Sequence, residues 1–180
     1  DRAFFKWLTA WRRPGQRNRS PTDMTQLPQQ TCVRLLADVA ATLRPSVDGF
    51  ADRDTLHNID QSISKARTAA NGDLPRPDLR EDSMAATQLT GKVELYSQGL
   101  FLDDADRESP LGRLTREQLA LVRDVADVAA RSLRAATGDE SNANSECQEG
   151  LSWAYDMAER LGDGSLQSRL QSLIDNAMSS

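Results

Sequence analysis

The sequence is poor in the side chains that most often bind metals or perform acid–base chemistry. Its 180 residues include one histidine, His57, and two cysteines, Cys32 and Cys147, which lie 115 positions apart. A histidine–cysteine metal site or a disulfide framework is therefore poorly supplied. Neither phosphate-binding glycine pattern, G-x-x-x-x-G-K or G-x-G-x-x-G, occurs. No apolar run approaches the ~18 residues that span a bilayer. We predict no bound metal and no cofactor.

β-Branched apolar residues are also scarce. Isoleucine and valine supply only 10 of the 69 hydrophobic residues, whereas leucine and alanine supply 44. Alanine and leucine lead the helix-propensity scale, and β-branched residues favour strands. The composition therefore excludes a β-sandwich or a parallel-sheet enzyme and predicts an all-α protein.

Hydrophobic periodicity and the positions of the seven prolines predict the helices. We expect an acidic helical bundle of five or six helices over residues 21–180, preceded by a short amphipathic arm helix within residues 1–20. The expected bundle helices span residues 28–44, 52–70, 78–100, 115–137, 146–161 and 165 onward. Asp78 and Glu81 form a candidate capping box at the start of the third helix. Residues 99–112 are predicted to be an acidic loop and residues 138–145 a solvated linker.

The helix that follows Thr115 has the strongest start signal. Thr115 and Gln118 have the spacing of a capping box, and Leu114 and Leu119 that of a hydrophobic staple. Apolar residues occupy two sides of this helix, which is typical of a surrounded helix. We therefore expect it at the centre of the bundle.

Three groups of titratable residues are candidates for chemistry. His57 lies away from the apolar stripe of its helix, which predicts an exposed side chain. The loop acids Asp103, Asp104, Asp106 and Glu108 imitate part of a calcium loop, but Ser109 and Thr115 replace its required glycine and its bidentate acid. Two pairs of acids also lie on the predicted fifth helix: Glu146 and Glu149, and Asp156 and Glu159. For the loop acids and for these pairs alike, the favoured interpretation is solvated charge.

Charge is distributed unevenly along the chain. Residues 1–20 carry a net charge of +5, whereas the other residues carry −10. An acidic surface repels phosphate and anionic lipid, so membrane or nucleic-acid binding is open only to the arm. Cys32 and Cys147 lie on apolar helical faces, which predicts two buried thiols and the cytoplasm or another reducing compartment. The sequence leaves open the question of whether an N-terminal leader is removed before Asp1.

The arm concentrates aromatic and basic side chains. In a helix, Phe4, Trp7 and Trp11 would lie on one face with Leu8. An isolated helix of about 11 residues is marginal in water, so this face needs a partner surface. The arm can pack on its own bundle, dock on another protein, or meet a membrane or nucleic acid. The candidate partner-binding residues are Phe4, Phe5, Trp7, Leu8, Trp11, Arg12 and Arg13.

These observations favour a non-catalytic helical interaction protein, such as an adaptor, an assembly subunit or a regulatory effector. It would dock another protein through the arm or through a groove of the bundle. The first alternative is a peripheral membrane or nucleic-acid-binding regulator that acts through the basic arm. The second is a Mg²⁺-requiring hydrolase that uses carboxylates. A small-molecule substrate is not expected, because no nucleophile–base pair is evident.

Overall fold

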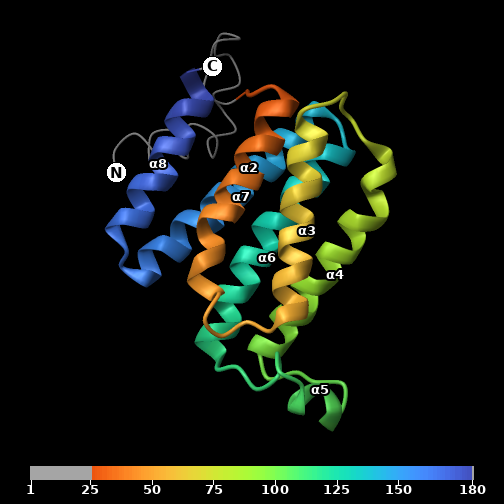
Figure 1. The fold of residues 1–180 in the computed structure, drawn as a ribbon, viewed down its shortest axis with the longest axis vertical. Coiled ribbons are helices and arrows are strands. Elements are labelled where there is room, and N and C mark those ends of the chain that lie inside the picture. The colour runs from red at the N-terminus through yellow and green to blue at the C-terminus, as the bar shows by residue number, and fades with distance from the viewer. Residues whose placement is uncertain (1–25, 180) are drawn as a thin grey trace, which may run out of the picture.

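The computed structural model describes residues 26–179, and this part of the chain is helical without any strand (Figure 1). It contains seven α-helices and two short 3-10 helices. The α-helices are α2 (Gln29–Leu43), α3 (Arg53–Ala70), α4 (Arg80–Ser97), α5 (Asp104–Glu108), α6 (Arg116–Thr137), α7 (Glu140–Leu161) and α8 (Gly164–Ser179). The 3-10 helices are η2 (Arg44–Val47) and η3 (Pro77–Leu79). The all-α prediction is confirmed.

Helix α6 lies at the centre, as its two apolar stripes predict. It contacts α2, α3, α4 and α7, and Val125, Val128 and Leu133 are fully buried. The predicted capping box is present: the backbone N–H of Gln118 donates to Thr115 Oγ1 at 3.1 Å, and the Gln118 side chain accepts from the Thr115 N–H at 3.0 Å. These bonds satisfy two donors that would otherwise be left open at the helix start.

The capping box predicted at the start of α4 is wrong. Helix α4 begins at Arg80 after η3, and its N-cap residue, Leu79, makes no side-chain cap bond. Asp78 instead accepts two hydrogen bonds from the Arg76 guanidinium, at 2.8 and 2.7 Å. The carboxylate is therefore already engaged with a neighbour two residues away.

The solvated linker predicted at residues 138–145 is also wrong, because α7 already begins at Glu140. Asp139 is its N-cap and accepts from the Asn142 N–H at 2.7 Å. Ala143 is fully buried, so this polar stretch has a packed face. Helix α7 is consequently longer than predicted and reaches the start of α2.

Two further segments are more helical than expected. Helix α2 ends just before Pro45, but the chain stays helical because η2 continues through Val47. The acidic loop at residues 99–112 contains the short helix α5, whose N-cap Asp103 accepts from the Asp106 N–H at 2.9 Å. Figure 1 shows α5 at the end of the structure opposite the start of α2.

The predicted burial of both cysteines is confirmed. Cys32 on α2 and Cys147 on α7 are free thiols with no exposed surface. Hydrogen bonding to the Cys32 thiol, together with burial, raises the pKa of the Cys147 thiol well above its usual value. Both helices lie against α6, so the thiols belong to the main apolar core.

Candidate functional site

All residues predicted to bind a partner lie outside the described residues 26–179. They are Phe4, Phe5, Trp7, Leu8, Trp11, Arg12 and Arg13. The other predicted docking element is a groove of the bundle, and the described residues do contain one.

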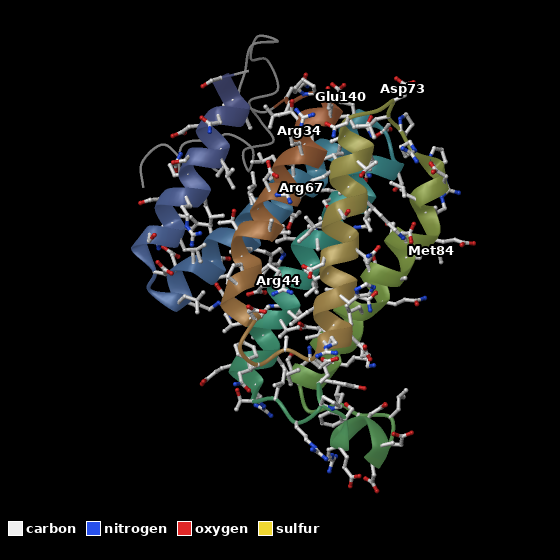
Figure 2. The ribbon with its side chains drawn as sticks, in the orientation of Figure 1. Arg34, Arg44, Arg67, Asp73, Met84 and Glu140 are labelled. Atoms are coloured by element: carbon white, nitrogen blue, oxygen red, sulfur yellow. The ribbon has the colours of Figure 1, made fainter. Side chains whose placement is uncertain are left out.

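Exposed large apolar side chains gather on α4 and the segment that follows it. Within residues 26–179, four of the five such side chains lie there: Met84, Leu95, Leu100 and Leu102. Leu102 is 95% exposed, and Met84 stands on the outer side of α4 (Figure 2). Single exposed apolar residues are ordinary, but a group on one face marks an interaction surface.

The end of α4 explains why Leu100 is exposed. Gly99 has a φ of +78°, a left-handed conformation that glycine adopts without steric cost. Its N–H donates to the Tyr96 carbonyl at 2.9 Å, and the Leu100 N–H donates to the Leu95 carbonyl at 2.9 Å. The chain then leaves the helix axis. The third helix was expected to extend over residues 78–100, and this end is wrong, because α4 ends at Ser97.

Three of these exposed side chains, Leu95, Leu100 and Leu102, border a groove of about 550 Å³. One wall is the outer face of α4, and the other is formed by residues 100–102 and α5. The rings of Tyr96 and Phe101 contact each other in its lining, with centroids 4.8 Å apart and planes tilted by 38°. The residues that line it are Gln88, Gly91, Lys92, Leu95, Tyr96, Leu100, Phe101, Leu102 and Asp106. Most of the exposed lining is thus apolar, and its two charged residues are Lys92 and Asp106.

The α5 end of the groove is acidic. Residues 103–108 contain four carboxylates and only one cation, Arg107, whose guanidinium lies 5.3 Å from the centroid of the Phe101 ring. Burial, followed by the charge of Asp106, raises the pKa of the Tyr96 phenol. Gly112 lets the chain pass behind α5, because a Cβ atom there would lie 2.2 Å from the Asp106 carbonyl oxygen. The acidic segment is therefore held beside the apolar lining.

Gly91 leaves the middle of the groove open. A Cβ atom built at this position meets no other atom within 4 Å. Glycine inside a helix costs about 0.5–1 kcal/mol relative to alanine. The fold therefore does not need a small residue at position 91, and a larger side chain there would extend from the groove lining into open space.

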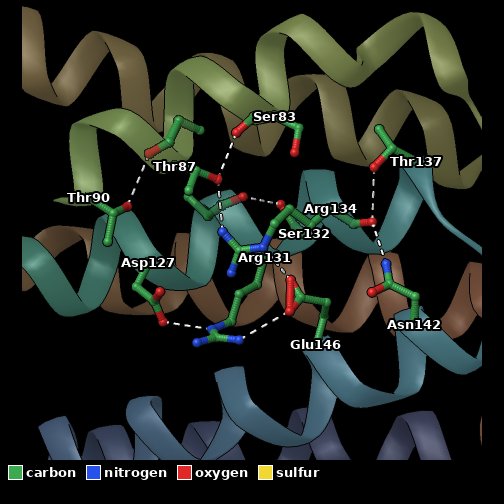
Figure 3. A network of polar contacts seen from close by, with 12 residues as sticks. Ser83, Thr87, Thr90, Asp127, Arg131, Ser132, Arg134, Thr137, Asn142 and Glu146 are labelled. Atoms are coloured by element: carbon green, nitrogen blue, oxygen red, sulfur yellow. Dashed lines mark hydrogen bonds and ion pairs between the residues drawn. The ribbon is translucent and has the colours of Figure 1, made fainter.

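A partly buried polar network joins α4, α6 and α7, and its role is structural (Figure 3). Arg131 donates to Asp127 at 2.8 Å and to Glu146 at 3.2 Å, and Arg134 also pairs with Glu146. Arg134 further donates to the Thr87 hydroxyl at 2.9 Å. Two arginines thus face two carboxylates, and the charges balance. Glu146 is half-buried, so the interpretation as solvated charge is wrong for this residue.

A second ionic cluster surrounds Asp124, whose side chain is fully buried. Arg160 pairs with one carboxylate oxygen, and Arg123 Nε lies 3.0 Å from the other. Arg123 also pairs with Glu94 at 2.7 Å and lies 4.4 Å from the centroid of the Trp153 ring. Desolvation, followed by repulsion from Arg123, lowers the pKa of Arg160. These contacts hold α4, α6 and α7 together.

Arg160 also borders a cleft of about 530 Å³ at the junction of α4, α6 and α7. Arg116 and Glu117 contribute opposite charges to this cleft, and Leu161 is its exposed apolar residue. It has no counterpart of the leucine cluster beside α4, and one of its arginines is engaged with Asp124. The α4–α5 groove is therefore the better docking surface.

The remaining candidates do not assemble into a site. His57 is exposed on α3, as predicted. Asp103 caps α5, and Glu149, Asp156 and Glu159 are exposed on α7. Among residues 26–179, no three histidine, cysteine or carboxylate side chains are placed to hold a metal ion. Nor does this part of the chain contain a helix with the length and apolar character needed to cross a membrane.

Comparison with models of known families, with curated proteins and with solved structures finds no match for this chain. Sequence reasoning missed the residues of the groove because Leu95 lies off the inward stripe of α4 and Leu102 lies beyond the end of that helix. The available signal was G-L-F-L at residues 99–102, an apolar run in front of four acids.

Proposed function

We propose that this chain is a non-catalytic helical interaction module that docks an amphipathic, positively charged helix in the α4–α5 groove. The observation that carries the proposal is the exposed leucine cluster of Leu95, Leu100 and Leu102 beside the acidic residues 103–108. A helix that lays an apolar face into a groove is a common mode of peptide recognition.

The apolar lining and the acidic end have separate roles in this docking. Burial of the exposed leucines supplies affinity at roughly 25 cal/mol per Å² of apolar surface. The carboxylates of Asp103, Asp104 and Asp106 select against acidic helices and speed the encounter with basic ones. The expected occupant therefore has apolar residues at i, i+3, i+4 and i+7 and basic residues beside them.

The test uses a labelled synthetic peptide of leucine and lysine with the leucines on one helical face. Two control peptides accompany it: a scrambled sequence of the same composition, and a version with glutamate in place of lysine. The full chain should bind the first peptide at least tenfold more tightly than either control. Equal binding of all three would show that the groove has no selectivity for a cationic amphipathic helix and would reject the proposal.

Two matched variants assign the binding to the groove. Leu95→Lys removes an apolar contact and adds a repelling charge, so peptide affinity should fall at least tenfold. Leu161→Lys makes the same change at the exposed leucine outside the groove and should leave the affinity within twofold. Both side chains are partly exposed, at 48% and 38%, so both variants should fold. Unchanged affinity in Leu95→Lys would place the binding elsewhere.

A further inference from the structure

The groove and the N-terminal segment of the chain have complementary chemistry. Residues 1–20 carry a net charge of +5 and four of the nine aromatic residues, whereas residues 103–108 carry −3. Phe4, Trp7 and Trp11 have the i, i+3, i+7 spacing of helix anchors, and Arg12 and Arg13 follow them directly. This is the pattern expected of the groove's occupant.

The lengths agree as well. The part of α4 that lines the groove runs from Gln88 to Tyr96, which is about 12 Å along a helix axis at 1.5 Å per residue. The three aromatic anchors would extend from Phe4 to Trp11, about 10–11 Å in a helix. The spacing of the three anchors therefore matches the length of the α4 wall of the groove.

The described chain begins where the segment can reach the groove. Leu27 is fixed to Asn144 on α7 by two hydrogen bonds, at the end of the structure opposite α5. The 22 residues of α6 run between these ends, a distance of about 33 Å. Trp11 and Leu27 are 16 positions apart, and fully extended this stretch of chain would span about 53–58 Å. The span is therefore within reach of the same molecule.

We propose that residues 4–13 dock in the α4–α5 groove of their own chain and compete there with a partner helix. This inference rests on the proposed function of the groove. A tethered segment is present at an effective concentration of about 1 mM, well above the micromolar concentration of a second copy in solution. The tether therefore favours docking within one molecule, and the arm regulates access to the groove.

The experiment measures competition in the full-length chain. The probe is a fluorescent peptide of residues 1–20, titrated into the wild type and into a full-length variant with Trp7→Ala and Trp11→Ala. If the peptide alone binds with a Kd of about 100 µM, the tethered arm at about 1 mM should weaken its binding to the wild type about tenfold. The tryptophan variant should bind it about tenfold more tightly than the wild type does.

Substitutions in the groove provide the matched controls. Leu95→Lys should abolish probe binding to either chain, whereas Leu161→Lys should retain the tenfold difference. Gly91→Gln adds a side chain to the groove lining and should lower the affinity for the probe. It should not lower the melting temperature, since glutamine is a better helix former than glycine. Unchanged probe affinity in Gly91→Gln and Leu95→Lys would overturn the inference.

The remaining outcomes separate this inference from the proposed function. Equal probe affinity for the wild type and the tryptophan variant would show that the arm does not occupy its own groove. Concentration-dependent dimers that disappear with Trp7→Ala would assign the arm to the groove of a second copy. Either result overturns the inference. If the leucine–lysine peptide still binds, the proposed function stands, and if neither peptide binds, both fail.

Discussion

The side-chain amide of Asn144 forms hydrogen bonds with both the backbone N–H and the backbone carbonyl of Leu27. Its side-chain oxygen accepts from the Leu27 N–H at 2.9 Å, and its side-chain nitrogen donates to the Leu27 carbonyl at 2.8 Å. The two residues are 117 positions apart in the sequence. One side-chain amide thereby fixes Leu27 against α7. The position of Leu27 sets the distance that the residues before it can span from this point.

Replacement of Asn144 by alanine tests this anchor. Asn144→Ala removes both bonds and leaves the partly buried polar groups of Leu27 without these partners. The free energy of unfolding should fall by about 1–3 kcal/mol. Urea denaturation measures the change. Asn58→Ala is the matched control, because its amide makes one long bond within its own helix, and it should shift stability by less than about 0.5 kcal/mol. Equal effects of the two variants would contradict the anchor.

A charge in the middle of α6 tests its central position. Val125 is fully buried, and Val125→Asp places an unpaired carboxylate among apolar side chains. Such a charge costs several kcal/mol, so the variant should unfold or lose cooperative melting. Leu102→Asp introduces the same group at a 95% exposed position and should melt as the wild type does. Circular dichroism during heating distinguishes them, and cooperative melting of Val125→Asp near the wild-type temperature would contradict burial of α6.

The two capping boxes show what sequence alone can predict. Thr115 and Gln118 have the right spacing and no competing partner nearby, and the box is present. Asp78 and Glu81 have the same spacing, but the Asp78 carboxylate accepts hydrogen bonds from Arg76 instead. In addition, η3 occupies residues 77–79, so that α4 begins only at Arg80. Local patterns therefore predict helices well where the competing contacts are weak. They fail where a charged neighbour or a change of helix type intervenes.

The candidate site was less accessible to sequence reasoning than the fold was. Inward-facing stripes follow from periodicity, which is why the position of α6 could be predicted. The groove depends on Leu95, which lies outside those stripes, and on the turn at Gly99 that brings residues 100–102 back beside α4. The placement of residues 100–102 beside α4 is a tertiary contact, which the periodicity of a single helix does not predict. The polarity of residues 138–145 hid the buried Ala143 in the same way.

The buried carboxylate of Asp124 should contribute strongly to stability. Asp124→Asn removes the negative charge that faces Arg123 and Arg160. Loss of one member of a fully buried ion pair costs about 3–5 kcal/mol. Because the Arg160 side chain is 47% exposed and regains water, we expect a smaller loss, about 2–3 kcal/mol. Asp156→Asn, an exposed change on α7, should cost less than about 0.5 kcal/mol. Similar denaturation midpoints for the two variants would show that the cluster adds little stability.

The raised pKa of Cys147 predicts a loss of stability at alkaline pH. In the unfolded chain the thiol loses its proton near its ordinary pKa of 9.0, whereas in the folded protein hydrogen bonding to Cys32 and burial keep it protonated. Stability from this group is complete below pH 9 and falls as the pH rises toward the folded pKa. The expected loss between pH 8 and pH 10 is about 1.4 kcal/mol.

Urea denaturation at pH 8, 9 and 10, with a reducing agent present, measures this dependence. Burial also raises the pKa values of Tyr96 and Tyr155 above 10.0, so these tyrosines add their own loss of stability as the pH approaches 10, and the contribution of Cys147 is read from the difference between the wild type and Cys147→Ala. Cys147→Ala lowers stability at every pH because it leaves a cavity, but its pH dependence should be flatter than that of the wild type by about 1.4 kcal/mol over this range. Parallel curves for the two proteins would show that the Cys147 proton is not coupled to folding.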